Sequence, residues 1–395
     1  MELKQIDSIL LKSLYLITMG IVMTQVLGMD TLTSLLFYLT FPLTVVLWLR
    51  SVRRTLTSSD GIMLLAAGLA VINVLLNAGI TGTRLSFEYL KKTIMFIMTL
   101  MFLQTANRLR IHENMVRFIG GVASILAIFF GVAFYILGED AYLLNGYRTH
   151  YLTFNFTNSN TTGMFLLCVY ILVMHRLIAL ERWYTKLIHL VLAVLLAWFI
   201  CLTQSRNSIL VMAIYTVIHL WLIFRSAGKR MRVGKLWAFL ASIVPAVFVG
   251  LYMLFVSTDW IQNIFGFLVG EGKGLDSRMK IWVNALKHLS QSPLIGAYSQ
   301  LSHGDGSFHM HNTHLDIACS YGIAVLVLVC VLLYRYFHQG GYRYRDKASY
   351  CYMLGFICAV LLGIGEAAMF SGGLGVYIFI GSLLLLSNSK TAEER

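Results

Sequence analysis

Long apolar runs separated by short polar stretches dominate this sequence. A helix needs about 20 mostly apolar residues to cross the hydrocarbon core of a bilayer. The pattern therefore predicts an all-α polytopic membrane protein with about twelve transmembrane helices. The expected spans are residues 9–29, 31–50, 60–80, 89–106, 116–137, 161–178, 186–203, 207–225, 236–257, 315–335, 350–368 and 371–388.

Composition excludes the other broad classes. Of the 395 residues, 58% are hydrophobic and 12% are charged, whereas about a quarter of a soluble domain is charged. With three prolines and no polar low-complexity tract, the chain is not disordered. All six cysteines lie in apolar stretches, where a thiol acts as a small hydrophobe and not as part of a secreted disulfide framework.

The net charge of +13 comes from basic residues that lie between the apolar segments, as residues that determine membrane topology do. If the amino terminus is cytoplasmic, 22 of the 31 basic residues fall in cytoplasmic segments, as the positive-inside rule requires. We therefore expect both termini inside and no nucleic-acid partner. The expected division is residues 1–257 with helices 1–9, an outer loop at 258–314, and residues 315–395 with helices 10–12 and a cytoplasmic tail.

Arg206 lies in the polar segment Thr203–Ser208 between two expected spans. The connection is too short to leave the interface, so Arg206 is expected at the outer membrane boundary. A snorkelling arginine at a helix end is the simpler interpretation. Hydrogen-bonding side chains surround it, however, and guanidinium matches phosphate oxygens in bidentate fashion, which favours an anion site.

A helix is predicted from Asp276 to Leu289, and it is amphipathic. At helical spacing, Arg278 shares a face with apolar residues. That face carries Trp282, Ala285 and Leu289, with Lys280 and Lys287 opposite. An arginine on the apolar side needs an anionic partner, either lipid phosphate or a specific ligand.

Histidines cluster just before the tenth expected span. His311 and His314 are one helical turn apart, but two histidines with one nearby acid make a weak zinc site, so no metal is expected. A single histidine held beside a hydroxyl could act in proton transfer near neutral pH. A single histidine is more often structural, so this segment by itself leaves both interpretations open.

Lesser candidates share the same outer side. They are Arg148 and His150 in the shorter outer loop, Lys91 and Lys92 at the start of the fourth span, and Glu366 near the outer end of the eleventh. Arg148 and His150 could extend a phosphate or sugar surface. The two lysines are expected to snorkel. A carboxylate at the depth of Glu366 is costly, which suggests that it orients an arginine or a histidine.

Three segments in order carry a family resemblance. They are Leu202–Asn207, the stretch from Ser277-Arg278-Met279 to Pro293–Gly296, and His311-Asn312 followed nine residues later by Gly322. Together they resemble the bacterial O-antigen ligase family, whose signature is H-[NSQ]-x9-G just before a span near the carboxyl terminus. The resemblance extends to the twelve expected spans, the cytoplasmic ends and the long outer loop before the tenth span.

The resemblance implies an activity and a location. O-antigen ligases transfer an O-polysaccharide from undecaprenyl diphosphate to lipid A–core, in lipopolysaccharide biosynthesis, at the periplasmic face of the bacterial inner membrane. They are inverting glycosyltransferases with a GT-C-like membrane fold, and they need no cofactor, neither nucleotide nor metal. The implied partners are the undecaprenyl-diphosphate-linked O-antigen, the lipid A–core acceptor and membrane lipids.

The family's functional positions map onto individual residues here. The resemblance assigns Arg206 and Arg278 to the diphosphate, His311 to the base, and Arg148 to a further arginine of the preceding periplasmic loop. Asn312 would orient His311 or a sugar hydroxyl. Some relatives have an aspartate where this chain has Glu366, which leaves the role of Glu366 open.

Two other functions remain open from the sequence. An O-antigen polymerase or another polysaccharide ligase of the same superfamily would use similar chemistry on a different acceptor. A transporter or flippase would place ionisable residues near the bilayer midplane of several spans. Here those residues gather at the outer boundary, which favours an enzyme.

Overall fold

The computed structural model describes most of the chain. The described residues are 5–53, 55–81, 87–144, 150–156, 158–180, 182–224, 233–255, 275–296, 310–338, 347–366, 370 and 376–388.

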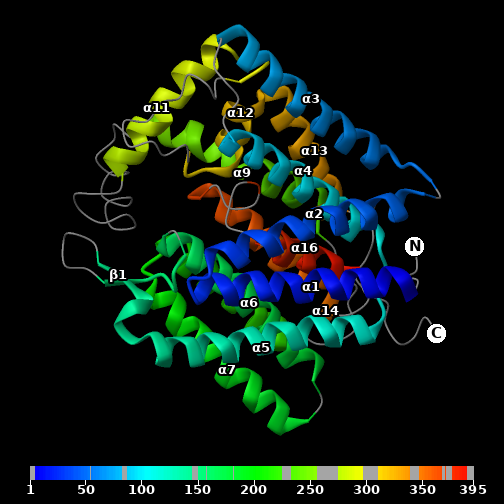
Figure 1. Ribbon diagram of the computed structural model, residues 1–395, viewed down its shortest axis with the longest axis vertical. Coiled ribbons are helices and arrows are strands. Elements are labelled where there is room, and N and C mark those ends of the chain that lie inside the picture. Colours follow the sequence, from blue (N-terminus) through cyan, green and yellow to red (C-terminus); the bar gives the residue numbers. More distant parts are fainter. Residues whose placement is uncertain are drawn as a thin grey trace.

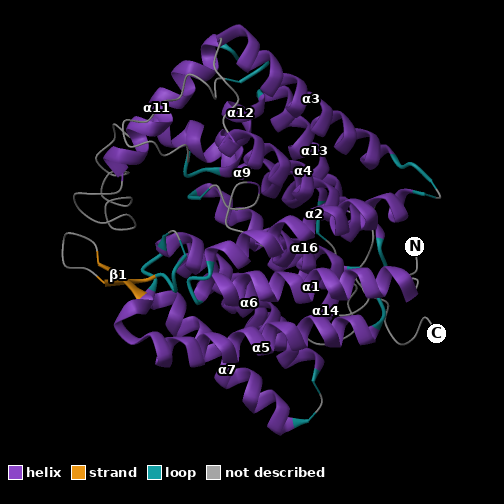
Figure 2. Ribbon diagram, in the orientation of Figure 1, coloured by secondary structure: helices purple, strands orange, loops and turns teal. Residues whose placement is uncertain are grey.

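Helices make up nearly all of the described structure (Figures 1 and 2). The first half contains α1 (Gln5–Val26), α2 (Asp30–Val52), α3 (Ser58–Thr81), α4 (Phe87–Arg108), α5 (Glu113–Leu137), η1 (Gly138–Ala141), β1 (Tyr142–Leu144), β2 (His150–Leu152) and α6 (Ser159–Ala179). The second half contains α7 (Trp183–Leu202), α8 (Arg206–Phe224), α9 (Lys235–Phe255), α11 (Leu275–Gln291), α12 (Thr313–Tyr321), α13 (Ile323–His338), α14 (Lys347–Leu361), η4 (Leu362–Ile364) and α16 (Val376–Ser387). β1 and β2 form a short antiparallel hairpin.

The helices confirm an all-helical polytopic membrane protein. Among the described residues, eight helices are long and apolar enough to span a bilayer: α1, α2, α3, α5, α6, α7, α8, and α14 together with η4. Shorter apolar helical stretches are Lys235–Leu251 of α9, α13 and α16. The total of twelve spans stays a prediction.

The tenth expected span, 315–335, is wrong as one continuous helix. It consists of α12 and α13, which meet at Gly322. Gly322 has a φ of +89°, a conformation that an L side chain rarely adopts and that ends a helix.

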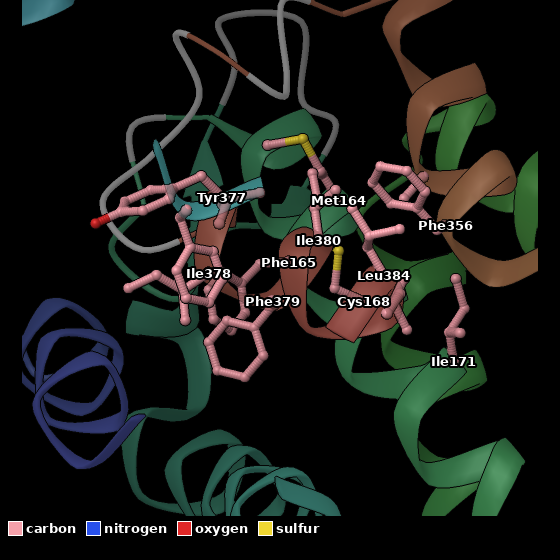
Figure 3. Packing of buried hydrophobic residues seen from close by; sticks show 14 of the residues in the cluster. Met164, Phe165, Cys168, Ile171, Phe356, Tyr377, Ile378, Phe379, Ile380 and Leu384 are labelled. Atoms are coloured by element: carbon pink, nitrogen blue, oxygen red, sulfur yellow. The ribbon is translucent and has the colours of Figure 1, made fainter. Parts of the chain in front are cut away.

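The centre of the molecule is a hydrophobic core around α16 (Figure 1). Every residue of α16 is buried, which agrees with its being apolar on all sides. Figure 3 shows α16 side chains packed against residues of α6 and α14. The labelled residues are Met164, Phe165, Cys168 and Ile171 of α6, Phe356 of α14, and Tyr377, Ile378, Phe379, Ile380 and Leu384 of α16. Helices farther out, such as α7, expose leucines and valines, as lipid-facing helices do.

The two ends of the bundle differ in their polar contacts. At the end where α1 begins and α16 finishes, ion pairs join neighbouring helices, including Arg50 with Asp7 (2.5 Å) and Arg108 with Asp60. We call this the termini end. The opposite end, which we call the site end, holds the α7–α8 turn, the start of α12 and the turn at residues 362–366 that follows α14. We call that last segment the α14 turn.

Candidate active site

Arg206 is the first residue of α8, immediately after a three-residue turn from α7. The short connection agrees with the expectation that this arginine stays at the end of the bundle. Its side chain is exposed, while Thr203 and Ser205 beside it are buried. The amino-terminal end of a helix carries about half a positive charge, so the helix adds to the positive potential around the guanidinium.

The polar neighbours of Arg206 form hydrogen bonds that build the turn. Thr203 donates its hydroxyl to Ile200 O (2.7 Å), and Ser205 bonds Ser208 hydroxyl to hydroxyl (2.9 Å). Gln204 has a φ of +53° and donates weakly to His150 O (3.4 Å) on the β-hairpin. The anion site at Arg206 stays a prediction.

His311 lies just before α12, in a strained backbone conformation with φ +48°. Its Nδ1 is 3.3 Å from Glu366 Oε2, and the two side chains are 32% and 15% exposed. A non-glycine residue at positive φ is uncommon, and such strain concentrates at functional sites. The contact places the carboxylate where it can hold one ring nitrogen and leave the other to face a substrate.

Other strained residues lie at the same end. Within the described chain, the non-glycine residues with positive φ are Phe154, Asn155, Gln204 and His311. Asn155 joins the segment after the β-hairpin to the end of α1, because its Nδ2 donates to Val26 O (2.8 Å) and its carbonyl accepts from Gln25 (2.8 Å).

The Asn312 side chain bonds backbone groups beside His311. It is fully buried, and its Nδ2 donates to Pro245 O (2.7 Å) and Ile364 O (3.1 Å). Its Oδ1 caps α12 by accepting from Leu315 N (2.9 Å). These bonds fix the backbone next to His311. That Asn312 orients His311 or a sugar hydroxyl stays a prediction.

The α14 turn joins the starts of α8 and α12. Asn207 donates to Leu362 O (2.6 Å), and Asn312 donates to Ile364 O (3.1 Å), only two residues further on. Thr313 donates to Glu366 O (2.9 Å). Arg206 immediately precedes Asn207, and His311 immediately precedes Asn312. The turn therefore brings the backbone at Arg206 near the backbone at His311, although more than 100 residues separate them in the chain.

α11 has the amphipathic orientation that the sequence predicts. Trp282, Ala285 and Leu289 are buried, while Lys280 and Lys287 are exposed. Arg278 is part of this helix, one turn before Trp282, but its side chain lies outside the described part.

The indole of Trp282 links α11 to the start of α12. Its Nε1 donates to Met310 O (2.7 Å), next to His311. The backbone at Arg278 is therefore one helical turn, about 5.4 Å, from a residue anchored beside His311. Further along, α11 passes the end of α12, where Cys319 lies against Ala285 O (3.8 Å).

The nine-residue spacing between the His311-Asn312 pair and Gly322 equals the length of α12. All nine residues, Thr313–Tyr321, are buried, and at 1.5 Å per residue they span about 14 Å. A Cβ at Gly322 would overlap Leu294 O, and Ile323 N donates to Pro293 O (2.8 Å). The glycine thus lets the Pro293–Gly296 segment pack directly against the end of α12, so these two motifs form one junction.

Lys92 corrects one expectation from the sequence. Its ammonium bonds Asp316 Oδ1 at 2.7 Å, with side chains 12% and 4% exposed, so it does not snorkel. Lys91 is exposed, as a snorkelling residue would be. The ion pair ties α4 to the buried α12. The pairing of Lys92 with Asp316 was not predicted, because the sequence shows Asp316 only as an acidic residue close to the histidines.

His311 and His314 form hydrogen bonds with different partners. His314 is buried and its Nε2 bonds Ser242 O on α9 (2.8 Å), while His311 faces Glu366. Among the described residues, no group of three or more His, Cys, Asp or Glu side chains could hold a metal ion. The candidate Arg148 lies outside the described residues, and His150 is exposed on β2.

The fold and this end of the bundle define a class: an all-helical membrane protein whose polar candidates gather at one end. Comparison with known families adds one likeness. A family model described as O-antigen ligase matches residues 191–330. This confirms the resemblance to the O-antigen ligase family, with the match running from α7 into α13. No curated protein gives a significant match.

The match covers about a third of the chain, so it shows a likeness to O-antigen ligases over this region. The matched region contains Arg206, Arg278 and His311, whereas Glu366 and Lys92 lie outside it.

Proposed function

We propose that this protein is an inverting O-antigen ligase of the bacterial inner membrane, with its active site facing the periplasm. It joins O-antigen polysaccharide from undecaprenyl diphosphate to lipid A–core. The observation that carries the proposal is the α14 turn. It accepts hydrogen bonds from Asn207 and Asn312, the neighbours of Arg206 and His311, and it carries Glu366 beside His311.

In the proposed reaction, Arg206 and Arg278 bind the diphosphate of the donor, and Arg148 extends the binding surface. The leaving group gains negative charge in the transition state, which preorganised guanidinium groups stabilise best where water is excluded. The amino-terminal end of α8 adds to this field. These groups supply the positive charge that a metal ion supplies in other enzymes, so the proposal includes no cofactor.

His311 acts as the base in this proposal. Glu366 accepts from Nδ1, so Nε2 is left to take the proton of the acceptor hydroxyl. The hydroxyl oxygen forms a bond to the anomeric carbon as the bond from that carbon to the diphosphate oxygen breaks. The electron pair leaves with undecaprenyl diphosphate. Attack opposite the leaving group inverts the anomeric centre.

Transfer between purified lipid substrates tests the proposal. The full-length protein is incubated with undecaprenyl-diphosphate-linked O-antigen and lipid A–core in the presence of chelator. We expect O-antigen joined to lipid A–core at a rate that chelator leaves unchanged. Transfer that appears only with an added divalent ion would refute the metal-free mechanism.

The same assay separates the alternatives. Extension of the donor's own glycan, with lipid A–core untouched, would identify a polymerase. Movement of the lipid-linked sugar across vesicles without a new glycosidic bond would identify a transporter. In cells, a deletion strain should keep polymer on undecaprenol and lose every O-chain from lipid A, whereas single-unit O-chains would indicate a polymerase.

Two variants test the assigned roles. His311→Ala and Arg206→Ala should abolish transfer, because one removes the base and the other removes a diphosphate ligand. Both proteins should still insert in the membrane, since His311 and Arg206 are partly or fully exposed. Full activity in either variant would exclude that residue from the reaction.

A further inference from the structure

α3 carries two buried amides in an otherwise apolar stretch. Asn73 and Asn77 are one helical turn apart, and they are 6% and 2% exposed. Polar groups buried in a membrane protein are costly unless they are hydrogen-bonded, and they commonly mark functional positions. Neither residue lies in the region that matches the family model, residues 191–330.

Both amides hold the junction where α11 and α12 end. The bonds run from Asn73 Nδ2 to Leu294 O (3.0 Å) and Tyr321 O (2.6 Å), and from Asn77 Nδ2 to Ile295 O (3.1 Å) and Gly296 O (2.9 Å). Asn73 alone bridges the two segments, because one of its acceptors follows α11 and the other is the last residue of α12. Tyr89 of α4 supports the same place by donating to Ser320 O (3.0 Å).

We propose that Asn73 and Asn77, the asparagine clamp, are positioning residues for the transfer reaction. The clamp fixes the direction of α11, which carries Arg278, relative to α12, which begins beside His311. This inference rests on the proposed function, because it is that function which assigns Arg278 to the donor and His311 to the acceptor.

Two points of attachment determine how α11 lies. The Trp282 indole attaches its middle at Met310, and the clamp attaches its far end. Arg278 precedes Gln291 by 13 residues, which is about 20 Å of helix. A tilt of about 3° at the clamp would therefore move the backbone of Arg278 by about 1 Å, and a misplacement of that size can cost about 100-fold in rate.

Kinetics of the full-length protein in the transfer assay test the clamp. The double variant Asn73→Ala/Asn77→Ala should lower kcat per folded molecule by about 10- to 100-fold and leave the KM of the acceptor within about twofold. Should the double variant not yield folded protein, Asn77→Ala, which leaves the bridging Asn73 in place, is measured in the same way.

Asn388→Ala is the matched control. Asn388 also donates its amide to two carbonyls, Ala106 O (3.1 Å) and Asn107 O (3.3 Å), but at the termini end. It should lose a similar amount of thermal stability and keep its kcat. If the clamp variants keep wild-type kcat per folded molecule, or if Asn388→Ala loses as much kcat as they do, the positioning role is refuted.

A distance measurement tests the clamp without relying on activity. Spin labels are placed at Val283→Cys in α11 and Val327→Cys in α13, both exposed positions, with Cys201 and Cys330 replaced by serine. The distance distribution should broaden in the clamp variants and stay unchanged in Asn388→Ala. An unchanged distribution in the clamp variants would overturn the inference. Absence of transfer by the wild-type protein would instead overturn the proposed function, while the distances would still decide whether the clamp orients α11.

Discussion

Replacing Glu366 by glutamine tests the proposed pairing of His311 as base with Glu366, and it changes the shape of the side chain least. The carboxylate lies 3.3 Å from His311 Nδ1, and both side chains are partly buried. At that distance two unit charges interact by about 5 kcal/mol at an effective dielectric constant near 20, an upper limit for a pair that water reaches. Glutamine keeps a neutral hydrogen bond but loses the charge that stabilises the imidazolium formed when His311 takes the proton.

The expected loss of rate follows from the difference between a hydrogen bond to a charged group and a neutral hydrogen bond. A hydrogen bond to a charged group contributes about 1.5–3 kcal/mol, against about 1 kcal/mol for a neutral one, and solvent exposure reduces the Coulomb contribution further. Because the interaction strengthens as charge forms on His311, the loss falls on kcat, and each 1.36 kcal/mol corresponds to a factor of ten. The difference of about 0.5–2 kcal/mol predicts that kcat of Glu366→Gln falls about 2- to 30-fold. The donor KM should stay unchanged, since the arginines are untouched.

Single-turnover transfer with saturating donor measures this effect. Glu366→Asp keeps the charge but shortens the side chain, so its rate should lie between those of the wild type and Glu366→Gln. Glu113→Gln is the control, because it removes the carboxylate of an exposed ion pair with Arg117 on α5, away from the site. Wild-type kcat in Glu366→Gln would refute the reasoning that the carboxylate supports the base.

Three further substitutions test other parts of the site. Gly322→Ala should lower the melting temperature sharply, because a positive φ alone costs about 1–2 kcal/mol and the added Cβ overlaps a carbonyl. Gly79→Ala is the control and should leave the melting temperature unchanged, because its Cβ would meet nothing within 4 Å. Lys92→Met should destabilise the protein by roughly 3–5 kcal/mol by leaving Asp316 charged and buried, and Asp316→Leu in the same chain should restore most of the loss in a denaturation assay. Arg206→Lys should raise the donor KM about tenfold in the transfer assay, because ammonium cannot bind a diphosphate in bidentate fashion. Unchanged melting, stability or KM in the respective variant would contradict each expectation.

The sequence was sufficient for features that depend on neighbouring residues. Apolar run length is a local property, so the helices were predictable from it, and so was the face of α11 that carries Trp282, because burial follows helical period. The motif around His311 was recognisable only through the family resemblance, and its spacing is that of one short helix. Two asparagines four residues apart in the apolar stretch of α3 are also a visible signal of buried hydrogen bonds.

Tertiary structure alone decided which polar groups meet. Nothing in the local pattern shows that Asn207 and Asn312 bond carbonyls of the same turn, or that Lys92 pairs with Asp316. The break at Gly322 was equally hidden, because an apolar run reads the same whether or not the helix continues through it. The physical reason is that hydropathy specifies whether a residue is buried, whereas a hydrogen bond or ion pair specifies a partner, and that partner is chosen only when distant segments pack together.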